Sequence, residues 1–222
     1  MVISPVQVKI CCIRSREEAQ LALSFGAAAL GMVSEMPDGR GELREGAIRE
    51  IVDEVPPSVG TFLLTAVSDV ERLVEKVVAC GVNTIQLWDP LPAADYPRLR
   101  RALPGVSLVQ AIHVLDRSAL ERAREAARKA DALVLDSSNP EVPYRWESRA
   151  GRTHDWEISR EIVDTVDCPV LLAGGLTPAN VEDAVRTVRP YGVDVCTGVR
   201  TEDVLDRRRV ASFFEAVRRI PQ

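Results

Sequence analysis

Long hydrophobic runs are absent from this chain of 222 residues. No apolar stretch approaches the ~20 residues that a membrane-spanning helix needs, and the first residues lack the pattern of a signal peptide. The five cysteines show no paired spacing, so we expect reduced thiols rather than a disulfide framework. These absences predict a soluble protein of the cytoplasm that has no membrane partner.

A concentration of positive charge is absent as well. The net charge is -5, and the 28 lysines and arginines are scattered along the sequence. Because nucleic-acid binding needs a basic patch, we expect no nucleic-acid partner. No linker, low-complexity run or charge block divides the chain, so residues 1–222 are expected to form one domain. The sequence sets no oligomeric state.

Hydrophobic strands and amphipathic helices instead alternate from end to end. Strands are expected at residues 6–10, 28–33, 59–64, 83–87, 106–114, 132–135, 170–172 and 192–195. Each is followed by a helical pattern, with apolar residues three or four positions apart. These eight units, with a period of ~25 residues, favour an α/β fold, the closed (β/α)8 TIM barrel, over a doubly wound open sheet.

Several residues are expected to cap helices. Ser15, Ser68 and Ser118 each precede a glutamate with the spacing of a capping box. Thr177 is the expected N-cap of the helix after the seventh strand. Asp155 is the expected N-cap of the helix that follows at Trp156.

Two consecutive strand ends are small and glycine-containing. Gly174 and Gly175 follow the apolar run at residues 170–172, where a bare backbone can approach a ligand closely. Taken alone, this is either an anion site or a tight connection that needs glycine only to turn. Thr197 and Gly198 follow the eighth strand in the same way. Phosphate sites in barrels often follow strands seven and eight, so we expect a phosphate-bearing ligand.

The first strand ends in two thiols, Cys11 and Cys12. A thiol at the mouth of a barrel can act as a base or nucleophile, although an isolated cysteine is more often a small buried hydrophobe. Because side chains alternate along a strand, we expect at most one of the two to face the pocket. Lys9 is expected to share a side with Cys11 only if the strand is irregular, and is given no role.

Asp136 directly follows the apolar sixth strand. It is either a cap for the next loop or a carboxyl group of the pocket, and its place at the barrel mouth favours the pocket. A partly buried carboxyl can serve as a general acid near neutral pH. A thiol from strand one and this carboxyl are therefore expected to flank one small ligand.

The connection at residues 137–155 is long for a βα loop, as lids often are. Its arginines, Arg145, Arg149 and Arg152, could meet an anion or stay solvated. A rival use of the thiols is a metal or redox site made with Cys196 after strand eight. The lack of a CxxC pair, and the presence of only two histidines, disfavour a metal.

Together these motifs resemble the phosphoribosylanthranilate isomerase family. The family has Lys-Ile-Cys-Gly after strand one, where this chain has Lys9-Ile10-Cys11-Cys12, and Gln-Leu-His-Gly at strand four, where this chain has Gln86-Leu87-Trp88-Asp89. The family's aspartate after strand six matches Asp136, and its glycine-rich lid ending in Phe-Asp-Trp matches residues 151–156. Its Ala-Gly-Gly-Leu-x-Pro-x-Asn-Val segment matches residues 173–181, and its Asp-Val-Ser-Ser-Gly-Val-Glu segment matches residues 194–200. The similarity covers nearly the whole chain in order.

The resemblance implies an Amadori rearrangement of N-(5-phosphoribosyl)anthranilate in tryptophan biosynthesis, with no metal or organic cofactor. It implies Asp136 as general acid and Cys11 as general base. It also implies that the substrate is bound by Gly151, Gly174, Gly175, Thr197 and Gly198. Backbone amides near the last four of these residues would hold the phosphate group.

The chain departs from the family pattern around the aromatic-acid side of the pocket. The departures are Cys12 for glycine, Trp88-Asp89 for His-Gly, Arg149 in the lid, Cys196 for serine and Arg200 for glutamate. The family's serine-arginine segment after strand two is not recognisable, although Arg40 could stand in for it. An isomerase or epimerase of another phosphosugar, or a non-catalytic barrel that binds a phosphometabolite, therefore stays open. The presence of both Cys11 and Asp136 favours an enzyme.

Overall fold

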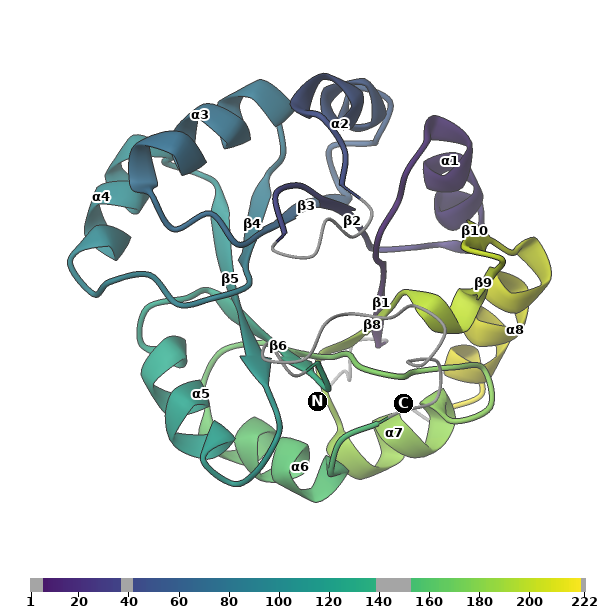
Figure 1. Cartoon of the computed structure of the whole chain (residues 1–222). Coiled ribbons are helices and arrows are strands. Elements are labelled where there is room, and N and C mark those ends of the chain that lie inside the picture. The colour runs from purple at the N-terminus through teal and green to yellow at the C-terminus, as the bar shows by residue number, and fades with distance from the viewer. Residues whose placement is uncertain (1–5, 37–41, 139–152, 221–222) are drawn as a thin grey trace.

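The computed structural model describes residues 6–36, 42–138 and 153–220. Eight parallel strands close into a barrel in chain order (Figure 1). The strands are β1 (Gln7–Ile10), β2 (Ala29–Val33), β3 (Gly60–Thr65), β4 (Thr84–Leu87), β5 (Ser107–His113), β6 (Ala132–Asp136), β7 (Val170–Leu172) and β8 (Gly192–Val195). Because β1 pairs with β8, with Val8 opposite Val193, the predicted barrel is confirmed and the open sheet is excluded.

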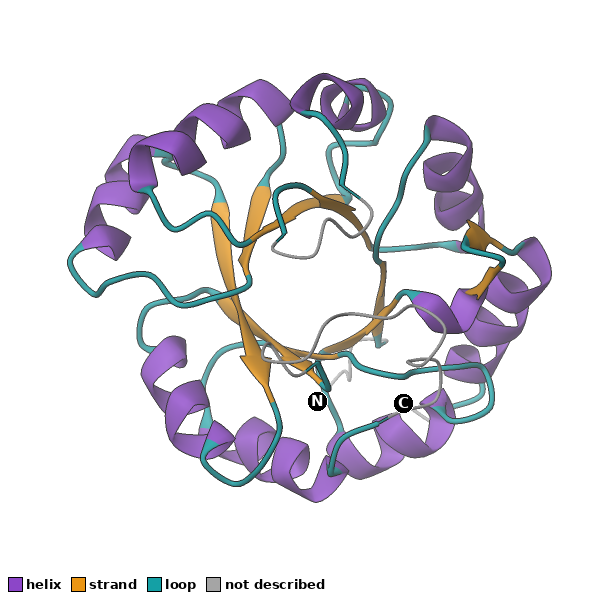
Figure 2. Ribbon diagram, viewed as in Figure 1, coloured by secondary structure: helices purple, strands orange, loops and turns teal. Residues whose placement is uncertain are grey.

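Helices surround the barrel as an outer ring (Figure 2). They are α1 (Arg16–Phe25), α2 (Glu45–Val52), α3 (Val70–Cys80), α4 (Asp95–Ala102), α5 (Ala119–Ala127), α6 (Trp156–Thr165), α7 (Val181–Val188) and α8 (Arg207–Arg218). After β8 come a 3-10 turn, η2 (Thr197–Val199), and a small hairpin, β9 (Arg200–Thr201) and β10 (Val204–Leu205). None of the described helices is long and apolar enough to cross a membrane.

Both faces of the strands are buried, which explains their nearly continuous apolar sequences. The outward side chains, such as Ile10, Leu30 and Leu133, pack under the helices in the main core. The inward ones form a second, smaller cluster inside the barrel that includes Phe62 and Val134. The barrel is therefore a filled core and not a pore.

Helix starts agree only partly with the expected caps. Ser15 accepts a hydrogen bond from the Glu18 amide, and Asp155 accepts one from the Glu157 amide, so both are confirmed as N-caps. The cap of α3 is Asp69, because its carboxylate reaches the Arg72 amide; the expectation for the serine at position 68 is wrong.

Two other expected capping interactions are wrong as well. Ser118 is the N-cap residue of α5, but its side chain makes no capping hydrogen bond, since its hydroxyl donates to Asp116. Helix α7 begins at Val181 with Asn180 as its N-cap residue, so Thr177 does not cap it. The Thr177 amide instead donates to the Asn180 side chain in a turn that lengthens the chain between β7 and α7.

Candidate active site

A cavity lies at the carboxyl ends of the strands, where barrels place their ligands. Its lining includes five residues predicted from the sequence, namely Cys11, Asp136, Gly174, Gly175 and Thr197. Gly198 is not part of the lining. Gly151, Arg40 and the three lid arginines at positions 145, 149 and 152 lie outside the described residues.

Cys11 and Cys12, which follow β1, both line this cavity. The expected alternation of their side chains does not apply, because β1 ends at Ile10 and Cys12 has a left-handed backbone with φ of 60°. The alternation of side chains therefore stops before Cys12. Cys11 and Cys12 pack together with Trp88 and Met36 at the mouth.

Lys9 lies inside the barrel, although the sequence analysis gave it no role. Its Nζ atom is 2.7 Å from Asp194 Oδ2, and both side chains are almost fully buried. Burial acts to lower the pKa of Lys9, but the Asp194 carboxylate outweighs it and raises that pKa above its ordinary value. A buried ammonium is therefore fixed beneath the cavity.

The Lys9 ammonium and the Cys11 thiol both lie against Gly31 of β2. A Cβ placed on Gly31 would lie 3.0 Å from both Lys9 Nζ and Cys11 Sγ. The two groups thus share one side of the chain, as residues two apart on a strand do, so the expectation that this would need an irregular strand is wrong. Any side chain at Gly31 would crowd the cation and the thiol together.

The structure favours the protonated form of Cys11. Its hydrogen bond with Cys12 raises the pKa of the Cys11 thiol, and burial raises it further. The positive charge of Lys9 acts in the opposite direction but is outweighed. Forming the thiolate therefore needs a change in these contacts or a higher pH.

Asp136 reaches the cavity from the end of β6. Its Oδ1 accepts from the Ser138 amide at 3.1 Å, and its Oδ2 accepts from the Ser138 hydroxyl at 2.9 Å. These two bonds fix the direction of the carboxyl group. The prediction that it belongs to the pocket, rather than only capping a loop, agrees with this placement.

His113, at the end of β5, stands next to Asp136 in the sheet register. Its ring lies edge-on to Trp88, with 4.4 Å between the ring centres. Burial lowers the pKa of His113, and the carboxylates of Asp136 and Asp89 only partly oppose this. A neutral imidazole therefore supports the Trp88 side of the mouth.

The loops after β7 and β8 are pressed against each other. A Cβ on Gly198 would lie 1.9 Å from the Leu176 carbonyl oxygen, so only glycine fits there. Gly174, with φ of 85°, lies similarly close to the Ser137 backbone. Within the described ranges, the amides of Gly175, Thr197 and Gly198 have no hydrogen-bond acceptor. Free amides in two touching loops are typical of an anion site.

The third thiol, Cys196, also lines the cavity and packs against the Cys11–Cys12 pair. The sequence-based expectation that these thiols could meet is therefore correct. No group of three metal-binding side chains with suitable geometry occurs among the residues that the structure describes.

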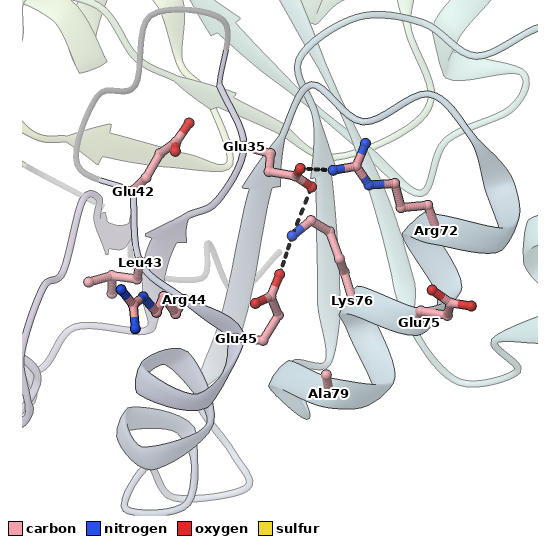
Figure 3. Close-up of a pocket in the computed structure, with 9 residues that line it drawn as sticks. All are labelled: Glu35, Glu42, Leu43, Arg44, Glu45, Arg72, Glu75, Lys76 and Ala79. Carbon is pink, nitrogen blue, oxygen red and sulfur yellow. Dashed lines mark hydrogen bonds and ion pairs between the residues drawn. The ribbon is translucent and has the colours of Figure 1, made fainter.

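A charged network beside the mouth holds the chain that follows β2 (Figure 3). Lys76 of α3 lies between Glu35, at 2.8 Å, and Glu45, and donates to the Ser34 hydroxyl at 3.1 Å. Arg72 also binds Glu35. Because Met36 follows directly and packs beside the thiols, this network supports one wall of the site. Sequence reasoning did not find it.

Comparison with known proteins fits this geometry. A family model described as "N-(5'phosphoribosyl)anthranilate (PRA) isomerase" matches residues 8–216. The chain belongs to the phosphoribosylanthranilate isomerase family. The N-(5'-phosphoribosyl)anthranilate isomerase of Methanocella arvoryzae is 35% identical over 96% of this chain and 98% of its own.

Solved structures of family members are similar as well. Phosphoribosylanthranilate isomerase from Thermotoga maritima has a TM-score of 0.83 at 27% identity, covering 96% of this chain and 98% of that one. Another family structure, in complex with reduced 1-(o-carboxyphenylamino)-1-deoxyribulose 5-phosphate, has a TM-score of 0.80 at 25% identity, with the same coverage.

Proposed function

We propose that this chain catalyses the family's reaction, the conversion of N-(5'-phosphoribosyl)anthranilate to 1-(2-carboxyphenylamino)-1-deoxyribulose 5-phosphate, in the tryptophan pathway of the cytoplasm. The observation that carries the proposal is that Cys11, Asp136 and the two glycine loops line one cavity. An acid, a base and an anion site at one barrel mouth meet the needs of a phosphosugar isomerisation.

The phosphate group binds at the loops after β7 and β8 in this proposal. The free amides of Gly175, Thr197 and Gly198 donate to its oxygens. This contact fixes the far end of the sugar. The ribose ring then lies over the middle of the cavity, between Cys11 and Asp136, and the aromatic ring lies toward Trp88 and Leu64.

The rearrangement needs one proton transfer to the sugar and one from it. Asp136, in its protonated form, donates to the ribose ring oxygen, the bond between that oxygen and C1' breaks, and the nitrogen lone pair forms an iminium. Cys11, as thiolate, then removes the C2' proton to give an enolamine, which tautomerises to the ketone. Each positioned acid or base is worth roughly 10²–10⁴-fold in rate.

Loss of substrate fluorescence tests the proposal directly. We expect the purified protein to consume freshly prepared phosphoribosylanthranilate, and Cys11→Ala and Asp136→Asn each to lower kcat by about 10²–10⁴-fold. Cys168→Ala is the matched control, because this free cysteine lies outside the cavity and outside the proposed machinery. Full activity in either active-site variant would overturn the assignment of roles.

A second candidate is the isomerisation of a different phosphosugar on the same scaffold. It is favoured by Trp88, whose large side chain stands at the mouth where the family pattern has histidine. Turnover of another phosphosugar, with none of the anthranilate substrate, would select this alternative. Stabilisation by phosphate without any turnover would indicate a binding protein instead.

A further inference from the structure

Cys12 has a backbone conformation that is unfavourable for its side chain. Its φ of 60° lies in the left-handed region, which glycine enters freely but a residue with a Cβ does not. Cys12 directly follows Cys11, and both residues line the cavity. Something outside the local sequence must therefore stabilise this turn.

The Arg200 guanidinium makes the contacts that do so. Its Nη2 donates to the Cys12 carbonyl oxygen at 2.5 Å and more weakly to that of Cys11 at 3.5 Å. Arg200 begins β9, after β8, and is only 6% exposed. It is not part of the cavity lining. It therefore reaches the thiols through the backbone and does not meet the substrate.

Glu18 of α1 holds the guanidinium in place. Its two carboxylate oxygens accept from Arg200 Nη1 at 2.8 Å and Nη2 at 3.0 Å. The same carboxylate accepts from the amides of Arg14 and Leu205. Burial acts to raise the pKa of Glu18, but Arg200 outweighs it and keeps that pKa below its ordinary value. Arg200 is buried and Glu18 is mostly buried, and this charged pair is bonded to three segments of the chain.

We propose that Arg200 is a positioning residue that holds Cys12 in its left-handed turn and thereby presents the Cys11 thiol to the substrate. Cys12 and Arg200 then act together: the Cβ of Cys12 makes the left-handed backbone unfavourable, and Arg200 stabilises that backbone by binding the Cys12 carbonyl oxygen. The proposal rests on the proposed function, in which Cys11 is the base.

A double-mutant cycle tests this coupling. Arg200→Met is expected to lower kcat by about 10²-fold with little change in KM, as for a misplaced catalytic group. In a Cys12→Gly background the same substitution is expected to lower kcat less than about 3-fold, because glycine needs no help to hold the turn. An equal loss in both backgrounds would overturn the proposal.

Alkylation of Cys11 by iodoacetamide gives a readout that needs no isomerase activity. Trypsin releases residues 10–14 as one peptide, and tandem mass spectrometry separates its two cysteines. We expect Arg200→Met to change the Cys11 alkylation rate at least about 5-fold, and the Cys12→Gly background to suppress the change. An inactive wild type that still shows this pattern would refute the proposed reaction and keep the positioning role.

Two further variants separate positioning from general loss of stability. Arg100→Met is the matched control, because Arg100 also binds a carboxylate and a carbonyl oxygen, those of Asp131 and Lys129, far from the cavity. It should leave kcat and alkylation unchanged. If Arg200→Met fails to fold, Glu18→Gln is used in its place and should give the same pattern. Unchanged alkylation in a folded Glu18→Gln protein would refute the proposal.

Discussion

The Lys9 ammonium and the Asp194 carboxylate form a 2.7 Å ion pair inside the barrel, beneath the cavity. Removing one partner would leave the other charge buried and unpaired. We therefore expect Lys9→Met to lower the free energy of unfolding by about 3–5 kcal/mol, as measured by urea titration. The double variant with Asp194→Asn should lose much less, and a loss as large as that of the single variant would contradict this reading.

The raised pKa of the Cys11 thiol predicts how its alkylation by iodoacetamide depends on pH. Only the thiolate reacts, so the alkylation rate should rise with pH and reach its plateau only above the ordinary range of a thiol. Cys12→Gly removes the hydrogen bond that contributes most to the rise, so its ascending limb should move to lower pH. An identical limb in both proteins would show that Cys12 does not control this thiol.

The contact between the loops after β7 and β8 predicts a binding defect. In Gly198→Ala the new methyl group would meet the Leu176 carbonyl and push the loops apart. We expect KM to rise by about 10-fold or more, with a smaller change in kcat, because the phosphate contact is shared by ground and transition states. Gly46→Ala is the control, since a Cβ there meets nothing within 4 Å.

Burial of His113 predicts an acid-sensitive stability. Because its pKa is lowered in the folded state, the unfolded chain binds more protons as the pH falls through the ordinary value near 6.5. The free energy of unfolding should therefore decrease from pH 7.5 to 5.5, even though Asp136 and Asp89 face the ring. His113→Gln should flatten this dependence in urea titrations at several pH values. An unchanged slope would assign the effect to another group, for example the partly buried His154, whose pKa burial also lowers.

The strand–helix order and the barrel followed from the sequence because apolar runs and helical stripes are local patterns. The glycine loops and the cavity positions of Cys11 and Asp136 followed from the same patterns, since a barrel fixes where strand ends meet. The alternation rule also places Lys9 on the side of Cys11, contrary to our expectation, whereas the ion pair of Lys9 with Asp194 depends on the pairing of β1 with β8.

Other features depend on contacts between distant segments. The left-handed Cys12 is stabilised by Arg200, which is 188 positions away. The Lys76 network likewise joins α3 to the chain after β2. Neither leaves a periodic signal in the sequence, because each depends on how the closed barrel places side chains from different units.

The pairing of β1 with β8 has a consequence for the order in which the molecule is made. The strand that carries Cys11 leaves the ribosome early, but Asp194 and Arg200, which hold the groups around it, are separated from their partners by more than 180 residues. Until the last strand–helix unit is synthesised, Lys9 has no counter-ion and the Cys12 turn has no support. The site is therefore completed by the final step of barrel closure, and a chain that stops before β8 has strands but no assembled site.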